Sequence, residues 1–334
     1  MKKAFTLVEL MIVIVILGIL GTISVEILQN TFKSYIKTKE LNKLAMKTDL
    51  TLNIIAAKLQ NRIKNSVIAV ECNATLPATD SNSCIYNGNK NFISIASLDP
   101  ANSYKYPVIE WLYVSKYSKM GMWDESKKYI QPGWSGFIDL KKTQIGGGDE
   151  YNISTPDSNF TIVRTIDTSW VNDWNVSNSG NIFNDKIDVL IFSGSDGRGD
   201  FEDINSSYGY YGNTATRVFQ IKNVIDDTDL NIKAITESNS TTVYEGYYIV
   251  RGAMAIVPVY DNNTHDYNLT LRLNYFPWNA ENYMDGNETL LATHVTQFKF
   301  KEEGGVLRIY LCITSPQVKL TDFNLTICKE KVVF

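Results

Sequence analysis

Histidine and proline are scarce in this chain of 334 residues, which has two His and eight Pro. With only His265 and His294, the chain offers little for general acid–base catalysis or for a zinc site. No Ser/His/Asp or Cys/His grouping stands out either, so we expect no enzyme activity and no catalytic residue. No proline precedes Pro77, so nothing before that residue forces a helix to stop.

Charged residues are also few, at 20% of the chain, and the formal net charge is −4. They are unevenly distributed, because residues 29–66 are basic and the remainder is acidic. An acidic remainder has no electrostatic footprint for a phosphate backbone, so no specific nucleic-acid partner is expected. The basic segment could contact DNA or anionic headgroups, but a solvated helix face is the simpler interpretation.

One long apolar run lies near the start of the chain. Residues 5–25 contain a single charge, Glu9, and are long enough to cross a bilayer as a helix. A lone carboxylate at that depth is costly, so it indicates a function. Lys2 and Lys3 precede the run and favour a cytoplasmic N-terminus.

Residues 2–10 read KKAFTLVEL and resemble the prepilin signal of type IV pilins and type II secretion pseudopilins. The resemblance implies cleavage by a prepilin peptidase between Ala4 and Phe5, followed by N-methylation. It also implies that Glu9 pairs with the terminal amine of a neighbouring subunit during assembly. Ala4 departs from the glycine that is usual before the cut, but it is also small. An ordinary secretory signal has a shorter apolar core, and a plain single-span anchor does not explain Glu9.

The resemblance implies a minor pilin or pseudopilin subunit, with the minor role suggested by the size of the head. Such a subunit is held in the bacterial inner membrane by one helix, with its head in the periplasm. It is then added to a type IV pilus, a type II secretion pseudopilus or a competence pseudopilus. Its partners are the prepilin peptidase, other pilin or pseudopilin subunits and the inner-membrane assembly platform. The alternative is a membrane-anchored surface glycoprotein or adhesin.

The expected fold is α+β, with a long N-terminal helix packed on a mainly antiparallel β-sheet head. Apolar residues recur at three- and four-residue steps to Ile63, which predicts one helix from Phe5 to about Asn65. We divide the chain into a leader (1–4), a transmembrane segment (5–28), an amphipathic continuation (29–66) and a β-rich head (67–334). A candidate inserted subdomain lies around 90–187.

Within the head we expect long loops over residues 150–187. Strands are predicted at 186–192, 247–260, 268–276 and 327–334. The clearest hairpin joins 295–300 to 306–313, because Gly304 and Gly305 supply the positive φ that a tight turn needs.

The chain has four cysteines, Cys72, Cys84, Cys312 and Cys328. An even number outside the cytoplasm indicates disulfides, and four cysteines allow three pairings. We favour the local pairs Cys72–Cys84 and Cys312–Cys328. The second pair resembles the C-terminal disulfide loop of many pilins.

An acidic, glycine-rich loop at residues 193–203 is a candidate metal site. Asp196, Asp200, Glu202 and Asp203 could supply oxygen ligands to Ca²⁺, although their spacing is not that of an EF-hand. A solvated acidic turn is the simpler interpretation. Calcium is the only cofactor that the sequence suggests.

Asn-x-Ser/Thr occurs ten times in the head, and in nine of these an acidic residue stands two places before the Asn. The pattern resembles the Asp/Glu-x-Asn-x-Ser/Thr acceptor of bacterial N-linked oligosaccharyltransferases, which would then be a further partner. Asn/Asp-rich loop composition is the alternative explanation. The nine are Asn73, Asn152, Asn159, Asn175, Asn205, Asn239, Asn268, Asn287 and Asn324, and Asn262 lacks the acidic residue.

Overall fold

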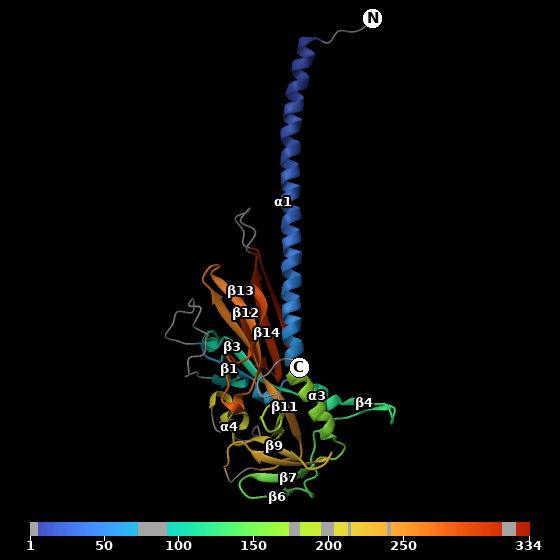
Figure 1. The fold of residues 1–334 in the computed structure, drawn as a ribbon. Helices are drawn as coiled ribbons and strands as arrows, with labels where there is room; N and C mark the ends of the chain where they lie inside the picture. Colours follow the sequence, from blue (N-terminus) through green and yellow to red (C-terminus); the bar gives the residue numbers. More distant parts are fainter. Residues whose placement is uncertain are drawn as a thin grey trace.

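The fold is one long helix standing on a β-sheet head, as the computed structural model shows (Figure 1). The structure describes residues 6–72, 92–173, 181–194, 204–212, 215–238, 242–315 and 325–334. Helix α1 spans Leu7–Leu59, and the head that follows is mostly antiparallel sheet. The predicted α+β class is confirmed.

The remaining elements of the head are short helices and fifteen strands in the described residues. The helices are η1 (Lys64–Ser66), η2 (Ile95–Ser97), η3 (Pro100–Lys105), α2 (Lys116–Met120), α3 (Phe160–Asp173), α4 (Ile204–Tyr208), η4 (Tyr210–Gly212) and η5 (Pro277–Asn279). The first strands are β1 (Ile68–Val70), β2 (Phe92–Ser94), β3 (Val108–Val114), β4 (Met122–Asp124), β5 (Tyr129–Gln131), β6 (Gln144–Ile145), β7 (Glu150–Ser154) and β8 (Val189–Phe192). The others are β9 (Val218–Val224), β10 (Asp229–Ala234), β11 (Tyr247–Asp261), β12 (Asp266–Tyr275), β13 (Asn287–Glu303), β14 (Val306–Thr314) and β15 (Thr326–Val333).

Thirteen of these strands form one sheet in the order β15-β14-β13-β12-β11-β8-β9-β10-β7-β6, with β3, β1 and β2 branching from β11. Strand β11 joins the two halves of this sheet, one formed by β12 to β15 and the other by β6 to β10. Its Tyr247–Val250 segment pairs with β8, and the segment from Val250 to Ile256 pairs with β3. Along the edge opposite β3, which is the edge that β8 also occupies, residues from Ala253 onward pair with β12. The long apolar run that predicted this strand is therefore buried almost throughout.

Two apolar clusters lie on opposite faces of the sheet, because side chains alternate along a strand. In β3, Ile109 and Trp111 belong to the cluster that α1 covers. Their neighbours Val108 and Leu112 belong to the other cluster, which includes residues of α3, α4 and η5. The centre of the sheet, at β3 and β11, is thus buried on both faces, and α1 covers only one of them.

Helix α1 ends six residues earlier than the predicted Asn65. Beyond Leu59 the chain turns to run beside β3. There the amide of Ile63 donates to the Leu112 carbonyl at 2.9 Å, and the amide of Val114 donates to the Asn61 carbonyl at 2.9 Å. These bonds to a distant strand replace the helical bonds that the amphipathic pattern alone would have continued.

The prediction of long loops over residues 150–187 is wrong. Strand β7 and the fourteen-residue helix α3 lie in that range. Asn159 begins the helix, because its Oδ1 accepts the amide of Ile162 at 3.0 Å, as an N-cap residue does. The buried face of the helix consists of Phe160, Val163, Asp167 and Val171. The acidic member of that face obscured its helical period in the sequence.

The predicted C-terminal hairpin is confirmed. Strands β13 and β14 pair in antiparallel register, and Gly304 and Gly305 both have positive φ, at 62° and 78°. Positive φ at both central residues characterises the two-residue turn that matches sheet twist. Strand β13 begins at Asn287, eight residues before the predicted Val295.

A buried ion cluster joins α3 to the sheet. Arg251 of β11 forms an ion pair with Asp167 of α3, and its Nε lies 3.8 Å from Asp188 Oδ1. The guanidinium is 3% exposed, stacks on Trp170 at 4.4 Å from the ring centroid, and donates to Ser115 Oγ at 2.9 Å. Burial raises the pKa of Asp188 well above its ordinary value. One cation therefore faces two buried carboxyl groups.

Glu110 is a further deeply buried acid, with 1% of its surface exposed. The Tyr211 hydroxyl donates to its Oε2 at 2.6 Å. Burial raises the pKa of Glu110 to about 7, and the hydrogen bond from Tyr211 offsets only part of that effect. At neutral pH the ionised form is thus disfavoured by the fold.

We predict that Glu110→Gln stabilises the head at alkaline pH and leaves it unchanged in acid. A carboxyl group with a raised pKa does not lower the free energy of unfolding below about pH 4.5, because it is protonated there in both the folded and the unfolded state. The free energy of unfolding then falls as the pH rises from about 4.5 to about 7, by about 3 kcal/mol in total, and levels off above that pH. Urea unfolding at pH 4.5 and pH 8.5 measures this, with the exposed Glu245→Gln as the control. Equal effects of Glu110→Gln at both pH values would contradict the prediction.

Candidate assembly site on the N-terminal helix

The start of α1 places Glu9 at the helix N-terminus. Thr6 is the N-cap, and its Oγ1 accepts the amide of Glu9 at 3.3 Å. In return, the Glu9 carboxylate accepts the backbone N–H and the hydroxyl of Thr6, both at 3.0 Å. This capping box holds the carboxylate within one turn of the beginning of the described chain. Among the described residues only Oε2 accepts these hydrogen bonds, so Oε1 can accept a further donor.

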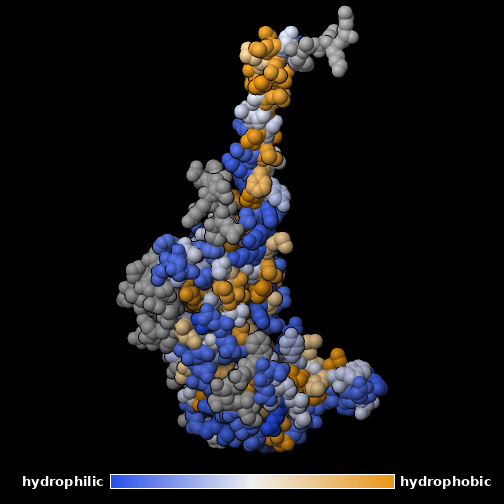
Figure 2. Space-filling view, turned by 45° about the horizontal axis from the view of Figure 1, so that its top comes forward, coloured by the Kyte–Doolittle hydropathy of each residue, from blue (hydrophilic) through white to orange (hydrophobic). Residues whose placement is uncertain are grey.

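The first half of α1 stands clear of the head (Figures 1 and 2). It is the one described helix that is long and apolar enough to cross a membrane, and its most apolar window is unburied. Contact with the head begins near Leu41, and Leu44 is the first buried residue. The segment from Leu7 to Leu41 is therefore about 50 Å long, against about 30 Å for a hydrocarbon core. A single N-terminal apolar helix of this kind fits a membrane-anchored protein.

The second half of α1 is fixed to the head by an apolar stripe that includes Leu52, Ile55 and Leu59. Polar contacts add to it. Lys47 Nζ donates to the carbonyl and hydroxyl of Thr293, at 3.0 and 2.9 Å. Burial, and to a lesser degree the charge of Lys43, lowers the pKa of Lys47. The amphipathic segment of the sequence thus contacts the head from about Glu40 to Leu59, and residues 29–39 belong to the projecting part.

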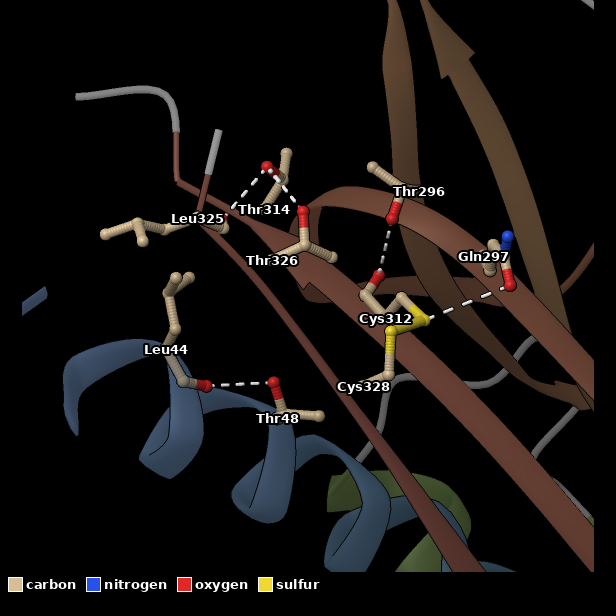
Figure 3. The surroundings of a disulfide bond; sticks show 9 residues. All are labelled: Leu44, Thr48, Thr296, Gln297, Cys312, Thr314, Leu325, Thr326 and Cys328. Atoms are coloured by element: carbon tan, nitrogen blue, oxygen red, sulfur yellow. Dashed lines mark hydrogen bonds between the residues drawn. A yellow bond between two sulfur atoms is a disulfide. The ribbon is translucent and has the colours of Figure 1, made fainter. Parts of the chain in front are cut away.

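A disulfide closes the strand pair on which α1 lies. Cys312 of β14 and Cys328 of β15 are bonded and stand directly opposite in the ladder, as predicted (Figure 3). Leu311 and Ile313 belong to the cluster beneath α1, so Cys312 between them points to the opposite face. Closing a loop of 16 residues stabilises the folded state by about 3 kcal/mol in the chain-entropy account. The disulfide therefore secures the surface that carries the helix.

Residues 1–25 match the family model of the prokaryotic N-terminal methylation motif. The chain carries a prepilin-type N-terminus. This motif is typical of type IV pilins and pseudopilins, and the match includes Ala4, Phe5 and Glu9. No curated protein and no solved structure matches the chain. The similarity thus covers the prepilin-type segment and not the head.

Among the predicted residues of the prepilin-type motif, Glu9 is described, while Ala4 and Phe5 lie outside the described residues. The reciprocal Thr6–Glu9 cap was not predicted. Its signal is in the sequence, because Thr-x-x-Glu before an apolar run is the capping-box pattern. The cap gives Glu9 a local structural role as well.

The other candidate sites are distributed over the head of this prepilin-like chain. Asp196, Asp200, Glu202 and Asp203 lie outside the described residues, so the calcium hypothesis stays a prediction. Within the described ranges, no group of three or more His, Cys, Asp or Glu side chains could hold a metal ion. Cys72 is disulfide-bonded, and Cys84 lies outside the described residues.

The predicted glycosylation sites differ in accessibility. Asn287 is exposed at the start of β13, and so are Asp285 and Thr289, the two other residues of its acceptor pattern. Asn159 is only 9% exposed, and its Nδ2 donates to Asp227 at 3.4 Å while it caps α3.

Of the remaining seven sites, three lie within the described residues and four lie outside them. Asn152 lies exposed on β7, Asn205 lies in α4 and Asn268 lies on β12, inside the sheet. The acceptor pattern of Asn268 ends at Thr270. The hydroxyl of Thr270 is buried and donates to the Val257 carbonyl. Outside the described residues are Asn73, Asn175, Asn239 and Asn324.

We predict that Asn287 carries a glycan in the native host and that Asn159 does not. A transferase acting on the folded head can reach the Asn287 amide, whereas the Asn159 amide is engaged at the end of a packed helix. Glycopeptide mass spectrometry measures both sites. Asn287→Gln should lower the intact mass by one glycan, and Asn159→Gln should leave the glycan count unchanged. A modified Asn159 or an unmodified Asn287 would contradict the prediction.

Proposed function

We propose that this protein is a minor pilin or pseudopilin subunit that assembles through α1 into a type IV pilus, a type II secretion pseudopilus or a competence pseudopilus. The observation that carries the proposal is the methylation motif at residues 1–25, continued by an apolar helix that projects from the head. Its role is structural and not enzymatic. The partners are the prepilin peptidase, the inner-membrane assembly platform and other pilin or pseudopilin subunits.

The exposed face of α1 supports assembly through helix packing. Leu28, Phe32, Tyr35, Met46 and Leu50 are all exposed. At about 100° per residue they fall on one face, roughly half a turn from the stripe of Leu44, Ile55 and Leu59 that contacts the head. Apolar side chains on the far side of a docked helix have no function within one subunit. Helices of neighbouring subunits would bury them.

The position of Glu9 supports the same proposal. An ionised carboxylate within a bilayer is costly unless a donor or a cation meets it. The Thr6 cap satisfies one oxygen and leaves the other available. After cleavage before Phe5, the amine of a neighbouring subunit would complete the pairing. In this view the head lies in the periplasm until the subunit enters the filament.

Peptide mass spectrometry of the N-terminus, on protein taken from its native membrane, tests the proposal. We expect a chain that begins at N-methylated Phe5. A chain that begins at Met1 would mean that Ala4 blocks processing and would favour a simple membrane-anchored protein. Cleavage after the apolar run would indicate a secreted protein. Either of these two results would overturn the proposed function.

A further inference from the structure

The hairpin of β4 and β5 stands apart from the rest of the head. In the described chain these two strands pair only with each other, whereas the other strands belong to the large sheet. The hairpin projects sideways from the axis of α1, near the level at which the helix ends (Figure 1). It is thus an arm, which we define as residues 121–132.

The arm exposes large apolar side chains that the described residues leave largely uncovered. Trp123 and Ile130 face each other across the two strands, so they lie on one face, and they are 53% and 57% exposed. Met122 and Tyr129 are exposed on the other face. Figure 2 shows the arm standing off from the head, with a hydrophilic tip beyond its apolar part. Contiguous exposed apolar residues on a protruding element indicate a binding surface.

Local interactions give the arm a defined shape. Asp124 Oδ1 accepts the amides of Ser126 and Lys127 at 2.9 and 3.0 Å. Lys128 adopts positive φ, at 60°. Gly121 also has positive φ, and a Cβ there would lie 1.8 Å from the Gln131 carbonyl oxygen. A lone two-stranded hairpin is marginally stable in water, so these features preserve a shape that burial in the head does not.

The charges of the arm are balanced within it. Lys127 pairs with Asp124 at 3.6 Å, and Lys128 pairs with Glu125 at 3.1 Å. A charged ligand or an anionic surface would find no net charge to bind. The outer edges of β4 and β5 have no strand partner among the described residues, so they offer backbone donors and acceptors to another strand. Apolar side chains beside open strand edges fit a protein surface.

We propose that the arm docks on the head of the adjacent subunit in the assembly, with Trp123 and Ile130 as its apolar anchors. This inference rests on the proposed function. Subunits that pack through parallel α1 helices have their heads side by side. The arm projects sideways from the helix axis, which is the direction in which such a neighbour lies. The contact holds adjacent heads in register, in addition to the packing of the helices.

Site-specific photo-crosslinking in the native host tests the docking. The photoreactive residue p-benzoylphenylalanine is placed at Trp123 in the full chain, and at Ile225 as an exposed apolar control. A third position, Tyr35 on the exposed face of α1, reports assembly through the helices independently. We expect the Trp123 position to crosslink to a pilin-like head and the Tyr35 position to crosslink to a pilin-like helix, with both products identified by mass spectrometry.

The outcomes separate the two proposals. A Tyr35 crosslink without a Trp123 crosslink, or a Trp123 crosslink only to a protein that is not a pilin-like subunit, overturns the docking arm and leaves the proposed function intact. Loss of both crosslinks to subunits overturns the proposed function. Trp123→Ser with Ile130→Ser should lower the subunit in the sheared filament fraction about tenfold, as for lost hot-spot residues. Glu125→Ala with Lys128→Ala should not change it, and equal losses in the two variants would also overturn the docking arm.

Discussion

Arg251→Met is expected to destabilise the head by about 3–5 kcal/mol, which is the usual cost of leaving a buried charge without its partner. The guanidinium faces Asp167 and Asp188, and both carboxyl groups are fully buried. Methionine fills a similar volume, so the loss reports electrostatics more than packing. Urea unfolding of the detergent-solubilised chain, followed by tryptophan fluorescence, measures the change.

A compensated variant separates charge from packing at this site. Arg251→Met combined with Asp167→Asn and Asp188→Asn replaces the guanidinium and both carboxyl groups, and we expect it to recover at least half of the lost stability. Arg251→Lys serves as the second comparison, because it keeps the charge but cannot stack on Trp170 or reach Ser115 in the same way. If the compensated variant were no more stable than Arg251→Met, the ion cluster would not be the source of the effect.

Glu9→Gln is expected to abolish incorporation into filaments while leaving membrane insertion and N-terminal processing intact. Glutamine can also occupy the third helical position of a capping box, so the variant keeps the cap and removes only the charge. A charge that meets a neighbour's amine in an apolar surrounding cannot be replaced by an amide dipole. The measurement is the ratio of the protein in the sheared filament fraction to that in the membrane, which we expect to fall at least about tenfold.

Two variants serve as controls for the charge of Glu9. Glu26→Gln removes the other acidic residue near the apolar run and should leave incorporation unchanged. Thr6→Ala removes the cap but keeps the carboxylate, and it should have a smaller effect, because a lost N-cap costs about 1 kcal/mol. Normal incorporation of Glu9→Gln would contradict the role of the charge. Equal defects in Glu9→Gln and Thr6→Ala would indicate that the cap, and not the charge, matters.

The features predicted correctly from the sequence are those that local patterns define. The apolar run and its single glutamate predict α1 and its motif, because membrane length and a helical period need only neighbouring residues. The β13–β14 hairpin follows in the same way from Gly304 and Gly305 between two apolar strands. For the candidate assembly site, Glu9 and the apolar N-terminal half of α1 were predicted from the sequence alone.

The features missed from the sequence depend on residues that meet only in the folded chain. Helix α3 has an ordinary N-cap, but Asp167 on its buried face breaks the apolar period unless Arg251 is known to lie opposite. Helix α1 ends at Leu59 because Asn61 and Ile63, just beyond it, form backbone hydrogen bonds with β3. The sequence does not distinguish the projecting arm from other short hairpins, because only the structure shows that the described elements leave it uncovered.

The sequence by itself therefore determined the long apolar N-terminal helix, its prepilin-type motif, the α+β class and the C-terminal hairpin. The tertiary structure decided where α1 leaves the head, which buried charges are paired, which acceptor asparagines are accessible and which hairpin projects. The physical reason is the range of the interactions. Helical period, turn geometry and membrane length are set by adjacent residues, whereas burial, ion pairing and exposure are set by contacts between segments far apart in the chain.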